Sequence, residues 1–275
     1  MSDVAASLAY GNNRSATPSR RVPNGILSLA LLVIVAVAWE AMIRLFHVSS
    51  LILPAPSAIV GSLIENRGKL ASAAGSTALE ILLGFVLAAL TGVIVALVIA
   101  RFERFGRALY PLIVLFQNVP KVALAPIFIL WFGFDLAPKI ALIVVIAFFP
   151  VAIDMLAGLQ SVEPSFVALM HSVGASRTQI LLRVRIPHSL PHLMAGLKVA
   201  ITFSVIGAIV GEFAGANHGL GYLIEFASTQ LDTALIFAGL TVISVLGLAF
   251  YYFVELAERL LVPWSPKFDA NLRAG

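Results

Sequence analysis

The sequence predicts an all-α integral membrane protein, built as a bundle of six transmembrane helices. Two observations carry this prediction. Hydrophobic residues make up 60% of the 275 positions and charged residues only 12%, which is far more apolar side chain than a soluble domain of this size needs for one core. The apolar residues also gather into six long windows, each near the roughly 20 residues that cross a ~30 Å hydrocarbon layer as a helix.

The six windows follow one another along most of the chain. They cover residues 26–46, 76–100, 109–130, 140–156, 193–212 and 234–256. The first is too long for a secretory signal, whose apolar core has about 7–15 residues, and a long polar tail precedes it. We therefore expect a retained anchor, a disordered cytoplasmic tail over 1–25, a transmembrane domain over 26–264 and a cytoplasmic tail over 265–275.

Lysine and arginine set the expected orientation, because they are retained preferentially on the cytoplasmic side. They gather in both terminal tails and in the connections between windows two and three and between windows four and five. The residues are Arg14, Arg20, Arg21, Arg101, Arg104, Arg107, Arg177, Arg183, Arg185, Arg259, Lys267 and Arg273. Both termini are thus predicted to be cytoplasmic, and this orientation explains the net charge of +4 without nucleic acid binding.

The polar segment 161–191, between windows four and five, is the most informative part of the chain. Pro164, after Glu163, suits the first position of a helix. Four apolar residues then recur at the i, i+3, i+4, i+7 spacing of one helix face: Phe166, Leu169, Met170 and Val173. Gly174 supplies the residue that most easily ends a helix in the left-handed conformation. The pattern predicts a short amphipathic helix that ends in a glycine corner.

A second short helix is predicted after this corner. Ser176 is followed three positions later by Gln179, which is the capping-box pattern. Ile180, Leu181 and Val184 give this helix its apolar residues, and Pro187 is expected to stop it.

These residues resemble the cytoplasmic "EAA" loop of ABC importer permeases. That loop ends in Gly, nine residues and Ile-x-Leu-Pro, and here Gly174 is followed after nine residues by Val184-Arg185-Ile186-Pro187. The acidic residue of its Glu-Ala-Ala triplet is replaced by Ala168. Residues 39–264 resemble the nitrate/sulfonate/taurine-type permeases in further stretches: Leu53-Pro54-Ala55-Pro56-Ser57, Gly174-Ala175-Ser176-Arg177, Val210-Gly211-Glu212-Phe213, Gly219-Leu220-Gly221-Tyr222 and Leu261-Val262-Pro263-Trp264.

The resemblance implies the MetI-like fold of type I ABC importers in the bacterial inner membrane. It implies two copies of a cytoplasmic ATPase, an extracytoplasmic binding protein and a second permease copy, by default an identical one. ATP and Mg belong to the ATPase in such a system, and no cofactor is expected on this chain. The expected ATPase-coupling residues are Glu163, Phe166, Leu169, Met170, Gly174, Ala175, Ser176, Ile186 and Pro187.

Amphipathicity alone leaves a second interpretation open, a helix lying on the lipid surface. Such a helix usually carries lysine and arginine on its polar face, whereas residues 164–173 contain neither. The spacing from Gly174 to Pro187 favours a docking role.

Polar residues within or beside the apolar windows are candidates for the transport pathway, because such groups are costly in a membrane. Gln117 and Asn118 interrupt the third window next to a proline. Glu212 lies at the outer end of the fifth window, and Asn217 and His218 follow in a polar stretch suited to an outer gate or to contact with the binding protein. A structural or merely exposed role stays open for all five.

Three other charged residues fall near the ends of the windows. Glu80, near the start of the second, is expected to be solvated. Asp154 and Lys198 are expected to pair beside the 161–191 loop.

No catalytic or metal site is predicted. The only Gly-Lys pair, Gly68-Lys69, lacks the spacing of a phosphate-binding loop, and no hydrolase motif is present. Cysteine is absent, and no His cluster supplies a third ligand. A secondary transporter with its own ion coupling is the alternative function, but the sharpest motif here is cytoplasmic.

The solute follows only from the resemblance. Nitrate, alkanesulfonates and taurine belong to the resembled family. Residues 167–172 and 211–222 look more like the branches that import pyrimidine thiamine precursors or riboflavin.

Overall fold

The computed structural model describes residues 24–264. The predicted tails, 1–25 and 265–275, lie outside these residues, except that Asn24 and the following Gly25 begin α1 (Asn24–Phe46). The chain divides into two compact units after His47. The first unit contributes α1, a helix of 23 residues that coincides with the first predicted window.

The second unit is also built from helices, and no residue from 24 to 264 lies in a β-strand. The all-α prediction is confirmed. The elements are α2 (Pro56–Glu65), α3 (Arg67–Arg101), α4 (Glu103–Gln117), the 3₁₀ turn η1 (Lys121–Leu124), α5 (Ala125–Phe132), α6 (Leu136–Gln160), α7 (Pro164–Ser172), α8 (Arg177–Ile180), the π-helical stretch η2 (Leu181–Arg185), α9 (Ile186–Gly215), α10 (Leu220–Thr229) and α11 (Thr233–Leu261).

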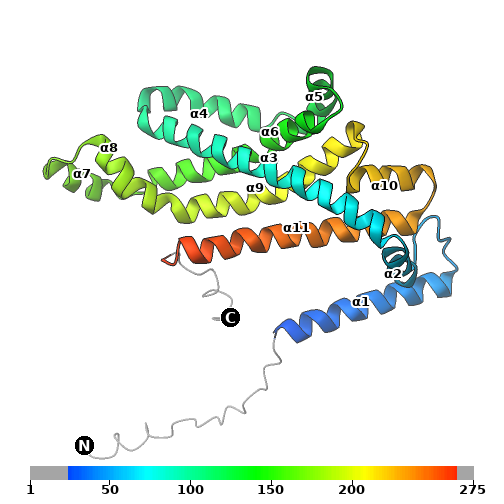
Figure 1. The fold of residues 1–275 in the computed structure, drawn as a ribbon. Helices are drawn as coiled ribbons and strands as arrows, with labels where there is room; N and C mark the ends of the chain where they lie inside the picture. The colour runs from blue at the N-terminus through cyan, green and yellow to red at the C-terminus, as the bar shows by residue number, and fades with distance from the viewer. Residues whose placement is uncertain (1–23, 265–275) are drawn as a thin grey trace, which may run out of the picture. The chain divides into compact units, whose positions relative to one another are not determined.

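Helices α3, α6 and α9 pack against one another along their lengths and form the centre of this unit (Figure 1). Glycines permit the close approach, as is common where helices meet in a membrane. A Cβ at Gly84 or Gly92 of α3 would overlap Ile143 or Val151 of α6. A Cβ at Gly207 of α9 would lie 3.1 Å from the Cα of Ile143.

Within the part of the chain that the structure describes, four helical segments are long and apolar enough to cross a membrane. They are Arg67–Arg101, Leu136–Gln160, Arg177–Gly215 and Thr233–Leu261. The third predicted window is not one straight helix, because Pro111–Gln117 and Lys121–Phe132 meet at 81°. Pro120 between them has no N–H to continue the helical hydrogen bonds. Counted as one broken span, this pair makes a fifth.

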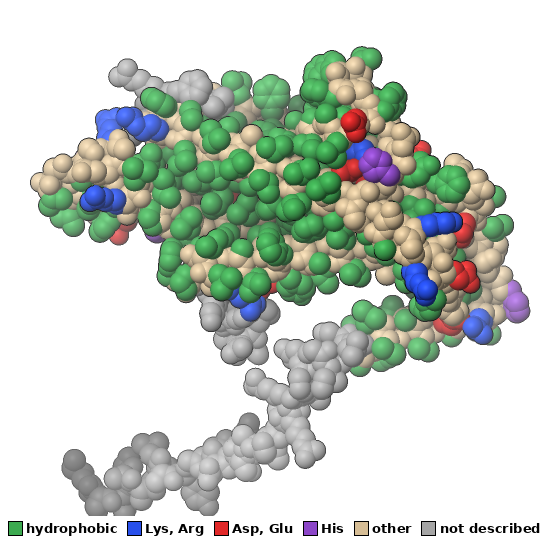
Figure 2. Space-filling view, viewed as in Figure 1, with side chains coloured by type: hydrophobic (Ala, Val, Ile, Leu, Met, Phe, Trp, Pro, Cys, Tyr) green, Lys and Arg blue, Asp and Glu red, His purple; other side chains and the backbone are tan. Residues whose placement is uncertain are grey.

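The second unit has two distinct ends. Helices α7 and α8 lie at one end, and α2 and α10 lie at the other (Figure 1). Figure 2 shows hydrophobic side chains covering much of the surface between these ends, with lysine and arginine gathered mainly toward the ends. Side chains such as Leu90, Ile94 and Leu248 are exposed. A wide apolar surface of this kind suits a bilayer, since soluble monomers rarely expose one.

Candidate functional site

The loop between α6 and α9 forms the predicted helix–glycine–helix corner. Helix α7 begins at Pro164, as expected. Its C-terminus is closed by two backbone hydrogen bonds: Gly174 N donates to His171 O at 3.0 Å, and Ala175 N donates to Met170 O at 3.0 Å. This pair of bonds is the Schellman motif. Gly174 has φ of +81°, the left-handed conformation that glycine adopts without a Cβ clash.

The capping box that opens α8 is also confirmed. Ser176 Oγ accepts a hydrogen bond from Gln179 N at 3.2 Å, and Gln179 Oε1 accepts one from Ser176 N at 2.8 Å. Ile180 then lies buried, with 3% exposure. The corner is therefore fixed on both sides of Gly174, by backbone bonds before it and by side-chain bonds after it.

Pro187 does not stop the second helix, so this prediction is wrong. Residues Arg177–Gly215 run as one helical segment of 39 residues. A π-helical stretch, Leu181–Arg185, precedes the proline, and Ile186 N donates to Leu181 O five residues back. The wider turn gives the chain a way to pass the proline ring and its missing N–H without ending the helix.

The apolar face of α7 is largely uncovered within the described chain. Phe166, Leu169 and Val173 are 45%, 57% and 72% exposed, and Met170 is half-buried. Glu163, at the start of the helix, is exposed and accepts a hydrogen bond from Ser165 Oγ at 2.5 Å. Ile186 is half-buried and Pro187 exposed. Exposed apolar side chains on a short capped helix mark a surface for a partner or for lipid.

A cleft lies between this corner and the C-terminal end of α3. Residues of the corner and of α3 line it: Ala100, Arg101, Val167, His171, Arg177, Ile180, Leu181 and Arg185. The arginines of two connections therefore lie at one end of the bundle. This agrees with their predicted placement on one side of the membrane.

A second cluster of polar residues lies at the opposite end, around Glu212. Its side chain is fully buried. Thr77 Oγ1 donates to Glu212 Oε1 at 2.6 Å, and Gly221 N donates to Glu212 Oε2 at 2.5 Å. Thr77 Oγ1 in turn accepts from Leu220 N at 2.8 Å. These bonds satisfy the backbone N–H groups that begin α10, where a carboxylate is favourably placed at a helix N-terminus.

Gly219 is required in this arrangement. Its φ is +111°, and a Cβ there would overlap the carboxylate of Glu212. The polar stretch after α9 is thus tied to the bundle, while Asn217 and His218 within it are exposed. The structure brings Glu212 and His218 to one end of the bundle and places Gln117 and Asn118 elsewhere, at the bend between α4 and η1.

Glu80 is not solvated, which corrects the expectation for this residue. It is 1% exposed and accepts a hydrogen bond from Lys139 Nζ at 2.5 Å, while Lys139 is itself 3% exposed. His218 Nε2 lies 3.9 Å from Glu80 Oε1. Burial of a charged pair requires such close contact, because each ion loses its hydration.

Two sets of contacts escaped sequence reasoning, one between α9 and α11 and one in this cluster. Lys198 forms an ion pair with Glu258 of α11, in place of the expected pairing with Asp154. Thr77 and Lys139 were not singled out, although Lys139 stands at the edge of an apolar window. Lys139 is a lone lysine beside one apolar window, and Glu80 is a lone glutamate in another. Because such charges are costly in a membrane unless paired, this combination could have predicted the ion pair.

An apolar helical bundle with several helices long enough to cross a bilayer defines a class, the helical membrane proteins. Residues 88–264 match the family described as binding-protein-dependent transport system inner membrane component. The chain belongs to this family, and it is the permease subunit of an ABC importer, an inner-membrane protein that is not itself an enzyme.

Similar proteins include three permeases. The formylaminopyrimidine transport permease protein ThiX of Halalkalibacterium halodurans is 36% identical over 232 residues, covering 84% of this chain and 92% of the relative. The riboflavin transport system permease protein RibX of Chloroflexus aurantiacus is 34% identical, covering 85% and 88%. The taurine transport system permease protein TauC of Escherichia coli is 29% identical, covering 86% and 89%.

The fold is similar to a solved ABC importer. The inward-facing MetNI methionine ABC transporter matches with a TM-score of 0.59 at 16% identity, covering 73% of this chain and 98% of the solved chain. This similarity establishes the MetI-like type I importer fold.

Proposed function

We propose that two identical copies of this permease form the pathway of an importer, driven by two cytoplasmic ATPase subunits and supplied by an extracytoplasmic binding protein. Each copy would cross the membrane six times, through α1, the bent pair and the four long segments, with both termini in the cytoplasm. The distribution of lysine and arginine supports this orientation. The gathering of Arg101, Arg177 and Arg185 at one cleft supports it further.

The mechanism rests on one continuous helical segment that runs from the corner to the far end of the bundle. The segment Arg177–Gly215 has 39 residues, about 58 Å at 1.5 Å per residue. Glu212 lies near its far end, bonded to the start of α10. A displacement of α7 and α8 by a closing ATPase dimer would therefore move α9 as a rigid body and shift the opposite mouth.

The contact with the ATPase is assigned to the exposed face of α7. Phe166, Leu169 and Met170 would be buried there, with Glu163 at its edge. Gly174, Ala175 and Ser176 hold the corner, and Ile186 and Pro187 pass the movement into α9. ATP and Mg would be bound by the ATPase, and this chain would hold no cofactor.

The other candidate residues receive distinct roles in the proposal. Glu212 would anchor the stretch that presents Asn217 and His218 to the binding protein. Gln117 and Asn118, both exposed at the bend, would line the pathway.

The solute proposed is a small organic molecule of the pyrimidine or riboflavin kind, with sulfonates and taurine as the other candidates. Permeases for formylaminopyrimidine and riboflavin are 36% and 34% identical to this chain, and the taurine permease is 29% identical. The two permeases for heterocyclic solutes are more similar in sequence to this chain than the taurine permease is, and this supports a heterocyclic solute.

The corner can be tested by substituting Gly174. Gly174→Val places a β-branched residue at positive φ, where it is strongly disfavoured, whereas Gly174→Asn tolerates the left-handed region. We expect Gly174→Val to remain in the membrane fraction but to lose the ATPase in pull-down, and Gly174→Asn to retain most of it.

Gly68→Val is the matched control, because a Cβ at Gly68 meets no atom within 4 Å. Equal ATPase retention by Gly174→Val and wild type would refute the coupling role. Ion-gradient-driven uptake by the permease alone in proteoliposomes would favour a secondary transporter instead.

A further inference from the structure

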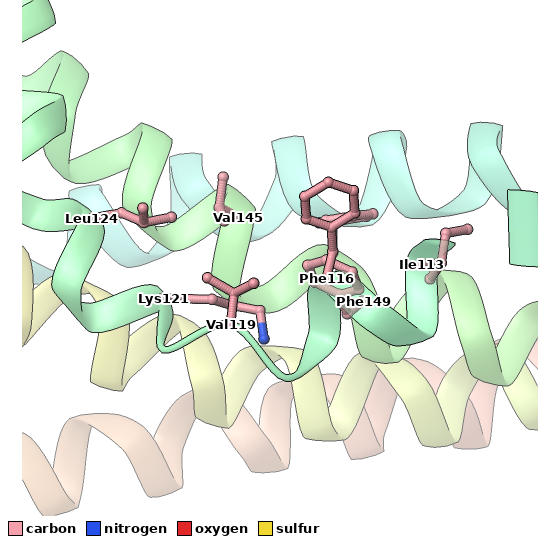
Figure 3. A pocket seen from close by; sticks show the side chains of 8 residues that line it. Ile113, Phe116, Val119, Lys121, Leu124, Val145 and Phe149 are labelled. Atoms are coloured by element: carbon pink, nitrogen blue, oxygen red, sulfur yellow. The ribbon is translucent and has the colours of Figure 1, made fainter. Parts of the chain in front are cut away.

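A pocket of about 270 Å³ lies inside the bend between α4 and η1 and opens beside α6 (Figure 3). Its walls include Phe116, Val119, Leu124, Phe148 and Phe149, with Lys121 as the single charged side chain of the lining. The rings of Phe148 and Phe149 have centroids 4.0 Å apart. The pocket is therefore an apolar, aromatic-walled space with one cation at its edge.

Lys121 is held in place but keeps a donor available. Its Nζ donates to Gln117 O at 2.8 Å and lies 4.7 Å from the centroid of the Phe149 ring. Among the side chains that the structure describes, no carboxylate lies within ion-pair distance of Lys121. An ammonium group has three N–H donors, and with one donated to Gln117 O, two remain for a ligand.

In the proposed six-span topology, the bend should face water or protein and not lipid. Residues 118–120 interrupt the helices, and irregular backbone at membrane depth is tolerated only where it is buried in protein or lines a watery cavity. Gln117, Asn118 and Val119 are all exposed in the single chain. The charge of Lys121 points the same way, because intramembrane charges face pathways or partners.

We propose that this pocket is a solute subsite of the pathway and that it takes a planar one- or two-ring heteroaromatic molecule bearing an anionic or carbonyl acceptor. A cavity of about 150 Å³ holds a benzene ring, so the volume here admits one such molecule. The phenylalanine rings offer faces for stacking, and Lys121 receives the acceptor. A small ringless zwitterion such as taurine would leave the aromatic walls unused.

The inference rests on the proposed function, because it assumes that the bend lines the pathway. A test is available because the chain contains no cysteine. Val119→Cys places a single thiol at the pocket, where Val119 is 40% exposed. The labelling rate with a small polar maleimide is measured in nanodiscs, with formylaminopyrimidine, nicotinate or taurine at millimolar concentration. Ser172→Cys, on exposed α7, is the matched control.

We expect at least one ring compound to slow labelling of Val119→Cys several-fold, taurine to have no effect, and Ser172→Cys to be unaffected. Adding Lys121→Gln or Phe116→Ala should weaken the protection. An unreactive Val119→Cys beside a reactive control would overturn the subsite, as would equal protection by taurine or protection by none of the three.

ATP-dependent uptake by the complex assembled with its ATPase and binding protein is measured separately. Uptake without protection rejects the pocket and keeps the proposed function. If the assembled complex shows no ATP-dependent uptake of any solute tested, the proposed function itself is rejected.

Discussion

The Lys139→Met variant should measure how much the buried charges stabilise the end of the bundle that carries α10. Lys139 and Glu80 are both almost fully buried, and their charged atoms lie 2.5 Å apart. Glu212 adds a second buried carboxylate that repels Glu80 and attracts Lys139. The cluster thus contains one lysine and two carboxylates, and only Glu80 lies within ion-pair distance of the lysine. Loss of the lysine leaves Glu80 without a cation at close range, save the exposed His218.

The magnitude follows from the cost of leaving one ion of a buried pair uncompensated, which is about 3–5 kcal/mol of unfolding free energy. Glu80→Gln should cost less, because Lys139 keeps its attraction to Glu212 and the amide oxygen still accepts a hydrogen bond; we expect about 1–3 kcal/mol. The double variant Glu80→Gln/Lys139→Met should be more stable than Lys139→Met alone, since it removes the charge left unpaired.

Unfolding in mixed micelles of increasing SDS content, followed by tryptophan fluorescence, measures these differences. Arg44→Met is the control, because Arg44 pairs with Glu40 while 72% exposed, and an exposed pair contributes about 0–1 kcal/mol. A Lys139→Met protein as stable as the control, or a double variant no better than Lys139→Met, would refute the reasoning.

Two further predictions concern the ends of the short helices. Gly219→Ala should destabilise the protein clearly more than Gly61→Ala, because it introduces a Cβ at φ +111° against Glu212, whereas a Cβ at Gly61 meets nothing within 4 Å. The same SDS titration measures the stability of both variants. Equal stabilities would contradict the anchoring of α10 by Glu212. Ser176→Ala removes the capping box of α8 and should cost about 1 kcal/mol of local stability, seen as faster amide exchange across α8 with α11 unchanged; unchanged exchange at Gln179 would show that the cap is dispensable.

Sequence patterns determined the elements of the 161–191 loop because their causes are local. Pro164 begins a helix, Gly174 ends it in a left-handed turn, and Ser176 with Gln179 caps the next; each effect acts over fewer than about five residues. Windows of hydrophobicity likewise located the long helices, since span length is set by bilayer thickness. These features needed no knowledge of what packs against them.

Only the tertiary structure decided which polar groups meet. Glu80 and Lys139 are 59 positions apart and Thr77 and Glu212 are 135 apart, so no local pattern links them. Whether a buried charge is solvated or paired depends on its neighbours in space, and sequence reasoning assigned Glu80 to the wrong state. The continuation of the helix past Pro187 also depends on tertiary contacts. Leu181 and Ile186 pack on the core, and this packing favours a π-helical turn over an end to the helix.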